Sequence, residues 1–142
     1  TTDVVAFLRT MERAIVAALA EEGITARGRD HEGPAYTGVW VGDRKIASIG
    51  VHASRWVTTH GYALNVDLDP APFTQWITAC GLEDAHFTSM AHELGRPLTV
   101  DDVRPAAAEA VAEVFGLELD ALPAGDGAGL WPQPVHEKLS LH

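Results

Sequence analysis

The sequence predicts an α+β fold in which a mixed, mainly antiparallel sheet is packed by helices. Three observations lead to this prediction: an amphipathic helix at the start, a hairpin of two apolar runs in the middle, and a second amphipathic helix further on. Apolar residues make up 46% of the 142 positions and charged residues 21%, which is enough to build a packed core. A chain of this length fits one domain.

The first predicted helix occupies the N-terminal segment. Apolar residues recur there at three- and four-residue spacing, while charged residues fill the opposite side. The apolar set is Val4, Val5, Leu8, Met11, Ile15 and Leu19, and the charged set is Arg9, Glu12, Arg13 and Glu22. Asp3 or Thr2 can cap the start of this helix and Gly23 can end it. The following segment, 24–36, is polar and broken by glycines, so we expect a strand fragment and then a loop.

Three strands are predicted next. The apolar runs 38–41 and 45–51 flank Gly42-Asp43, a pair typical of a tight hairpin turn, and therefore predict two antiparallel strands. Gly50 and the small residues just before it would let a backbone or a ligand approach the second strand closely. Residues 62–66 form the third candidate strand, which ends at a turn-forming Asp-Leu-Asp-Pro sequence.

Helical turns are expected at 72–76 and 89–94. Beyond them, Thr99 with Asp102 three residues later predicts a capping box, and an apolar face then runs to Gly116.

Prolines affect two further parts of the chain. Pro105 lies past the first turn of the predicted helix, so we expect the helix to begin later or to kink. Repeated glycines and prolines in 120–142 predict a loosely structured tail.

Composition excludes several functional classes. Ten basic residues against 20 acidic ones give a formal net charge of −10, which opposes binding to nucleic acid. There is no apolar run of the roughly 20 residues that a membrane span requires, and the N-terminus lacks the pattern of a signal peptide. The single cysteine, Cys80, suits a reducing compartment, so we expect a cytoplasmic protein that binds neither membrane nor nucleic acid.

Few residues point to chemistry by themselves. Cys80 is the one thiol, and a thiolate is a strong nucleophile, although a lone cysteine is more often an inert buried residue. The seven histidines show no zinc-ligand spacing, and there is no phosphate-binding loop, so we expect no metal and no ATP. Half of the basic residues lie within 27–55, where they form either a solvated face or a docking surface for an acidic partner.

Four segments together resemble the octanoyltransferase family, which moves an octanoyl group from acyl carrier protein to lipoyl domains. These segments are 38–41 (GVWV), 45–50 (KIASIG), 60–66 (HGYALNV) and Cys80-Gly81, in this order. The resemblance implies a fold similar to the catalytic domain of biotin and lipoate protein ligases. Residues 1–119 would form the C-terminal part of that domain. The family's N-terminal Arg-Gly-Gly and Tyr-His-Gly-Pro-Gly-Gln signature is absent here, so we expect these residues alone to be poorly active and unstable or self-associated.

The resemblance also implies roles for individual residues. Cys80 matches the nucleophile that carries the acyl group as a thioester, and Lys45 matches the lysine that lowers the pKa of that cysteine. Two segments match those lining the acyl site, and their residues are Ser48, Ile49, Gly50, Gly61, Tyr62 and Ala63. His60 precedes the second segment and either orients that turn or takes part in catalysis. Ala79 stands where the family commonly has proline, which affects the seating of Cys80. No cofactor is implied.

The implied donor is octanoyl-acyl carrier protein. The implied acceptors are the lipoyl domains of 2-oxoacid dehydrogenases and the H protein of glycine cleavage. Two alternatives remain: an ATP-dependent lipoate or biotin protein ligase, and a non-catalytic fragment that only docks carrier proteins. Because adenylate-forming ligases do not need a cysteine, Cys80-Gly81 favours the transferase.

Overall fold

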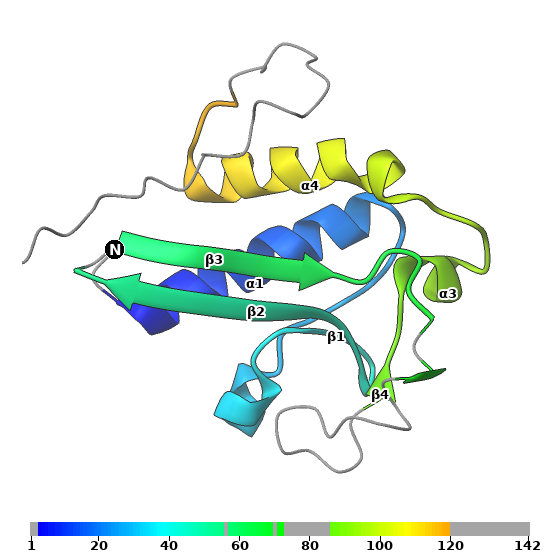
Figure 1. Cartoon of the computed structure of the whole chain (residues 1–142), viewed down its shortest axis with the longest axis horizontal. Coiled ribbons are helices and arrows are strands. Elements are labelled where there is room, and N and C mark those ends of the chain that lie inside the picture. The colour runs from blue at the N-terminus through cyan, green and yellow to red at the C-terminus, as the bar shows by residue number, and fades with distance from the viewer. Residues whose placement is uncertain (1–2, 56, 70, 73–85, 120–142) are drawn as a thin grey trace, which may run out of the picture.

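The computed structural model describes residues 3–55, 57–69, 71–72 and 86–119. The helical elements are α1 (Val4–Glu21), the 3-10 helices η1 (Asp30–Glu32) and η2 (Pro34–Tyr36), α3 (Met90–Leu94) and α4 (Val100–Phe115). The strands are β1 (Val39–Val41), β2 (Arg44–Ser54), β3 (Val57–Leu64) and β4 (His86–Phe87) (Figure 1). The predicted α+β fold class is confirmed.

β2 is the central strand of the sheet. It pairs antiparallel with β1 on one side and with β3 on the other, and its first two residues pair in parallel with β4. The Gly42-Asp43 turn joins β1 to β2 as predicted, with Gly42 at a φ of +61°. The sheet is therefore mixed but mainly antiparallel.

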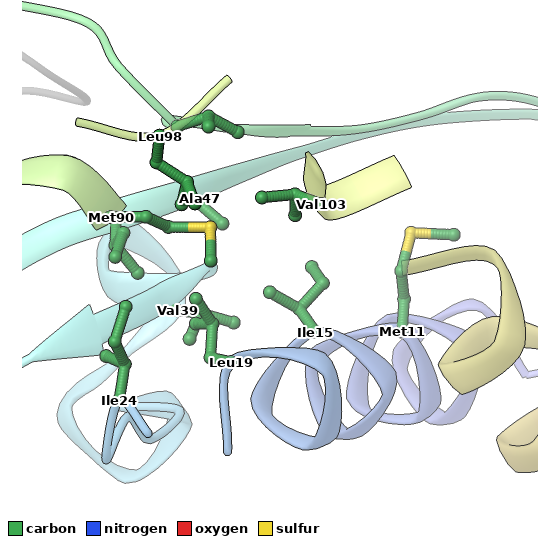
Figure 2. Close-up of a cluster of buried hydrophobic side chains, with 11 residues drawn as sticks. Met11, Ile15, Leu19, Ile24, Val39, Ala47, Met90, Leu98 and Val103 are labelled. Carbon is green, nitrogen blue, oxygen red and sulfur yellow. The ribbon is translucent and has the colours of Figure 1, made fainter. Parts of the chain in front are cut away.

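The two long helices pack against each other, and the rings of Phe7 and Phe115 lie 5.4 Å apart between centroids. Figure 2 shows Ile15 and Leu19 of α1 directed toward Val39 and Ala47 of the sheet. The helices thus cover one face of the sheet. On the other face the described part of β2 and β3 carries exposed residues at positions 48, 50 and 63.

The helix caps agree with the sequence. The Asp3 carboxylate accepts hydrogen bonds from the backbone N–H groups of Val5 and Ala6 at the start of α1. Thr99 and Asp102 form the predicted capping box of α4, and Ser89 caps α3. Pro105 lies inside α4, which begins directly after Thr99, so the expectation of a later start is wrong.

Other expectations need correction or lie outside the described residues. β3 begins at Val57 and not at Tyr62, because the polar residues before Tyr62 pair with β2 across a long hairpin. Within 24–36 the predicted strand fragment is reduced to a single bridge between Arg27 and Trp40. The expected turn at 72–76, from residue 73 onward, and the tail 120–142 fall outside the described part. Within that part, none of the helices combines the length and apolar character needed to cross a membrane.

Candidate active site

A β-bulge in the first half of β2 sets which face Lys45 occupies. Val39 pairs with Ala47 and Trp40 pairs with Lys45, so Ile46 is the extra residue of the bulged strand. Ile46 and Ala47 are both fully buried in the core, although neighbours in a regular strand face opposite sides. The bulge therefore places Lys45 on the face opposite the helices, together with Ser48 and Gly50.

The two segments that the family resemblance assigns to the acyl site lie directly opposite each other. Ser48, Ile49 and Gly50 of β2 pair with Ala63, Tyr62 and Gly61 of β3, respectively. The six residues divide between the two faces of the hairpin. Ile49 and Tyr62 pack against the core under the helices, and burial raises the pKa of the Tyr62 hydroxyl. Ser48, Gly50 and Ala63 are exposed on the opposite face.

Lys45 is buried, with 4% of its surface exposed. Its ammonium nitrogen lies 5.6 Å from the centre of the Trp40 ring, within the range of a cation–π contact. The Trp40 ring is itself held, because its Nε1 donates to the carbonyl of Tyr36 at 2.9 Å and the Arg29 guanidinium lies 4.6 Å from the ring centre. The contact with a fixed ring gives the Lys45 side chain a defined position beside Trp40.

Arg44, the neighbouring cation, is engaged elsewhere. Its guanidinium donates from Nε and Nη2 to the two oxygens of Glu93 on α3, at 2.9 and 3.0 Å. The Arg44 hydrogen bond, helped by one from Thr88, lowers the pKa of Glu93, and the same pair raises the pKa of Arg44. Arg44 thus anchors α3 to β2.

Glu12 is a feature of the site that sequence reasoning placed wrongly. The helical pattern assigned it to the charged outer side of α1, but it is only 4% exposed. Its carboxylate accepts hydrogen bonds from Arg9 at 2.6 and 2.7 Å and from the backbone N–H of Gly38 at 3.0 Å. Periodicity indicates which face of a helix is apolar, but it does not show which charged residues accept hydrogen bonds in the protein interior.

The remaining predicted residues are placed as follows. Cys80 and its neighbours Ala79 and Gly81 lie outside the described residues. The backbone of His60 pairs with Val51 in the β2–β3 hairpin. Across 3–55, 57–69, 71–72 and 86–119, no group of three or more His, Cys, Asp or Glu residues is arranged to hold a metal. The basic residues of 27–55 are partly used in ion pairs, since Arg27 and Arg29 both lie near Glu32.

Solved structures share this fold. The crystal structure of lipoate-protein ligase A bound with ATP matches with a TM-score of 0.69 at 18% identity, covering 87% of this chain and 52% of that one. A T. acidophilum protein with bound lipoic acid matches with a TM-score of 0.61 at 20% identity, covering 84% of this chain and 49% of that one. At such identities the likeness shows the fold alone, which is that of lipoate-protein ligase A.

The family model of the lipoyl protein ligase A/B catalytic domain matches residues 1–112, and the chain belongs to this family. Similar curated relatives are octanoyltransferases, which confirms the resemblance seen in the sequence. That of Solibacter usitatus is 49% identical over 117 residues, covering 82% of this chain and 50% of the relative. That of Mycobacterium tuberculosis H37Rv is 42% identical over 127 residues, covering 87% and 52%. That of Myxococcus xanthus is 45% identical over 128 residues, covering 85% and 34%. The chain spans about half the length of the first two relatives and a third of the last.

Proposed function

We propose that the protein containing this chain transfers an octanoyl group from octanoyl-acyl carrier protein to a lysine of a lipoyl domain, by way of a thioester on Cys80. The observation that carries this proposal is the placement of a buried lysine, Lys45, on the same sheet face as the small residues Ser48, Gly50 and Ala63. The octanoyltransferase relatives, 42–49% identical, support the choice of reaction.

The reaction has two halves. In the first, the Cys80 thiolate attacks the carbonyl carbon of the donor thioester, and a new C–S bond forms as the C–S bond to the carrier breaks. The carrier leaves as a thiol after taking a proton from the Lys45 ammonium. In the second, the amine of the acceptor lysine attacks the Cys80 thioester, the amide forms, and Cys80 departs as the thiolate. Because one thioester replaces another, the first half needs no ATP.

Lys45 would serve both halves. As an ammonium near Cys80 it would lower the pKa of the thiol and raise the thiolate fraction at neutral pH. As an amine it would take the proton that the acceptor lysine loses when it attacks. The burial of Lys45 supports this role, since a cation in a site of low dielectric acts more strongly on a neighbouring thiol than one in water.

The hairpin would supply room for the acyl chain. At Gly50 and Gly61 a Cβ atom would meet no atom of the described chain within 4 Å. Strand positions without side chains let a ligand approach the backbone closely. We assign four residues to this surface: Ser48, Gly50, Gly61 and Ala63. Ile49 and Tyr62 support the surface from the core side. His60, next to Gly61 in β3, is a candidate for orienting this part of the strand.

The acceptors would be the lipoyl domains of 2-oxoacid dehydrogenases and the glycine cleavage H protein. We place the reaction in the cytoplasm, where a lone cysteine stays reduced.

The test compares two donors in the intact protein. A lipoyl domain is incubated with octanoyl-acyl carrier protein, or with octanoate and ATP, and its mass is measured. Transfer from the carrier protein alone, abolished by prior alkylation with iodoacetamide, is the result expected. Transfer that needs ATP and survives alkylation would identify a ligase, and no mass gain with either donor would indicate a binding fragment.

A further inference from the structure

Glu12 is a buried charged group that the reaction described above does not use. It lies in the middle of α1, and both its oxygens accept from the Arg9 guanidinium, which fixes the carboxylate in one orientation. Arg9 is in turn 3.8 Å from the carboxylate of Asp30. One of the Glu12 oxygens then reaches across to the sheet and accepts the backbone N–H of Gly38, just before β1.

Gly38 touches Lys45 directly. A Cβ atom at Gly38 would lie 2.7 Å from the Lys45 ε-carbon, 3.3 Å from its ammonium nitrogen and 2.6 Å from the carbonyl oxygen of Ala47. Gly38 also has a φ of +132°, which residues with side chains rarely adopt. The end of the Lys45 side chain therefore lies against the bare α-carbon of Gly38, and only glycine fits at this point.

Two contacts among the described residues hold the end of the Lys45 side chain. Gly38 makes one contact, and the Trp40 ring, 5.6 Å from the ammonium nitrogen, makes the other. Trp40 is fixed through its own hydrogen bond to Tyr36. The backbone of Gly38 has its buried acceptor in Glu12, on a different element of the fold.

We propose that Glu12 is a positioning residue for Lys45, which it holds in place by fixing the Gly38 backbone against the lysine side chain. The catalytic meaning of this placement rests on the proposed function. The placement itself does not, because it follows from the contacts of Glu12, Gly38 and Lys45.

If Glu12 only linked α1 to the sheet, its substitution would not change the reactivity of Lys45 in the folded protein. The chain offers a direct readout of the difference, because Lys45 and Lys138 are its two lysines. Trace labelling of the intact protein with acetic anhydride, followed by digestion and mass spectrometry, gives the ratio of modification at Lys45 to that at Lys138. Neither octanoyl-acyl carrier protein nor a lipoyl domain is present in this measurement.

We expect Glu12→Leu to raise the Lys45 to Lys138 ratio several-fold. Glu12→Gln keeps an oxygen that accepts from Gly38 and should stay near wild type. Arg9→Leu removes the partner that orients the Glu12 carboxylate and should raise the ratio by an intermediate amount. This variant replaces Glu12→Leu in the test if Glu12→Leu does not fold. Asp102→Ala breaks the α4 capping box away from Lys45 and controls for loss of stability.

A wild-type ratio in folded Glu12→Leu or Arg9→Leu would overturn the proposal, as would an equal increase in Asp102→Ala. The same variants then report on catalysis. Glu12→Leu should lower kcat for octanoyl transfer with little change in KM for the donor, and Glu12→Gln should restore it. If Lys45→Met leaves transfer unchanged, the proposed role of Lys45 in the reaction fails, while the labelling ratio still decides whether Glu12 positions it.

Discussion

Gly50 of β2 lies directly opposite Gly61 of β3, and a Cβ at either position would meet nothing within 4 Å in the described chain. Two facing glycines contribute no cross-strand side-chain pair, so they weaken a hairpin rather than strengthen it. Their placement on the sheet face that also carries Lys45 is explained if that surface receives an extended ligand. Substitution of Gly50 tests this interpretation.

Gly50→Val should fold normally, because the position is open and β-branched residues favour strands. It should lower kcat/KM for octanoyl transfer by about tenfold, or about 1.4 kcal/mol, and affect a butyryl donor less. Steady-state kinetics with both donors provides the measurement. Ser54→Val places the same valine side chain at an exposed position further along β2 and is the control. Equal losses for the two donors would contradict an acyl-binding role.

The ion pair between Arg44 and Glu93 predicts a pH dependence of stability. Because the hydrogen bond from Arg44 lowers the pKa of Glu93, the pair contributes stability above about pH 4.3, the ordinary pKa of glutamate, and loses it as the pH falls through the lower folded value. The free energy of unfolding of wild type should therefore exceed that of Glu93→Gln at neutral pH. This difference should shrink on acidification, and a difference that grows in acid would refute the assignment.

Burial of α1 predicts an effect on stability. Ile15 is 1% exposed and lies in the core, so Ile15→Ala should lower the free energy of unfolding by about 2–5 kcal/mol. Val5→Ala, at a position that is 58% exposed on the same helix, should change it by less than about 0.5 kcal/mol. Urea denaturation of the intact protein measures both. Similar losses at the two sites would mean that α1 does not pack as described.

The two neighbouring cations of β2 should affect the thiol differently. If Lys45 activates Cys80, then Lys45→Met moves the midpoint of iodoacetamide alkylation at Cys80 up toward about pH 8.5, the value of an unperturbed thiol. Arg44→Met should leave the midpoint near wild type, because Arg44 already donates to Glu93. An unmoved midpoint in Lys45→Met would reject the activation.

Elements marked by a regular apolar period or by a local motif were predicted well. The spacing of Met11, Ile15 and Leu19 and the capping pair at Thr99 mark α1 and α4 because a helix repeats its environment every turn. The hairpin turn at Gly42 is equally local. These signals place most elements within a few residues of their observed bounds.

Features that depend on partners distant in sequence were not predicted. The bulge at Ile46 is visible only when β1 is aligned with β2, and it decides the face on which Lys45 lies. The buried Glu12 carboxylate accepts from Arg9 and also from Gly38, 26 residues away, and the second contact has no local sequence signal. Periodicity also underestimated β3, since its polar first half is a strand only through its pairing with β2. The contact between Lys45 and Cys80 remains a prediction from the family resemblance.

Covalent catalysis by Cys80 is tested most directly by the intact mass of the protein after incubation with octanoyl-acyl carrier protein and no acceptor. Wild type should gain one octanoyl group, because no lipoyl domain is present to take the acyl group from the Cys80 thioester. Cys80→Ser should gain none. The same mass increment in Cys80→Ser would contradict the assignment of Cys80 as the nucleophile, and no increment in wild type would contradict the covalent mechanism itself.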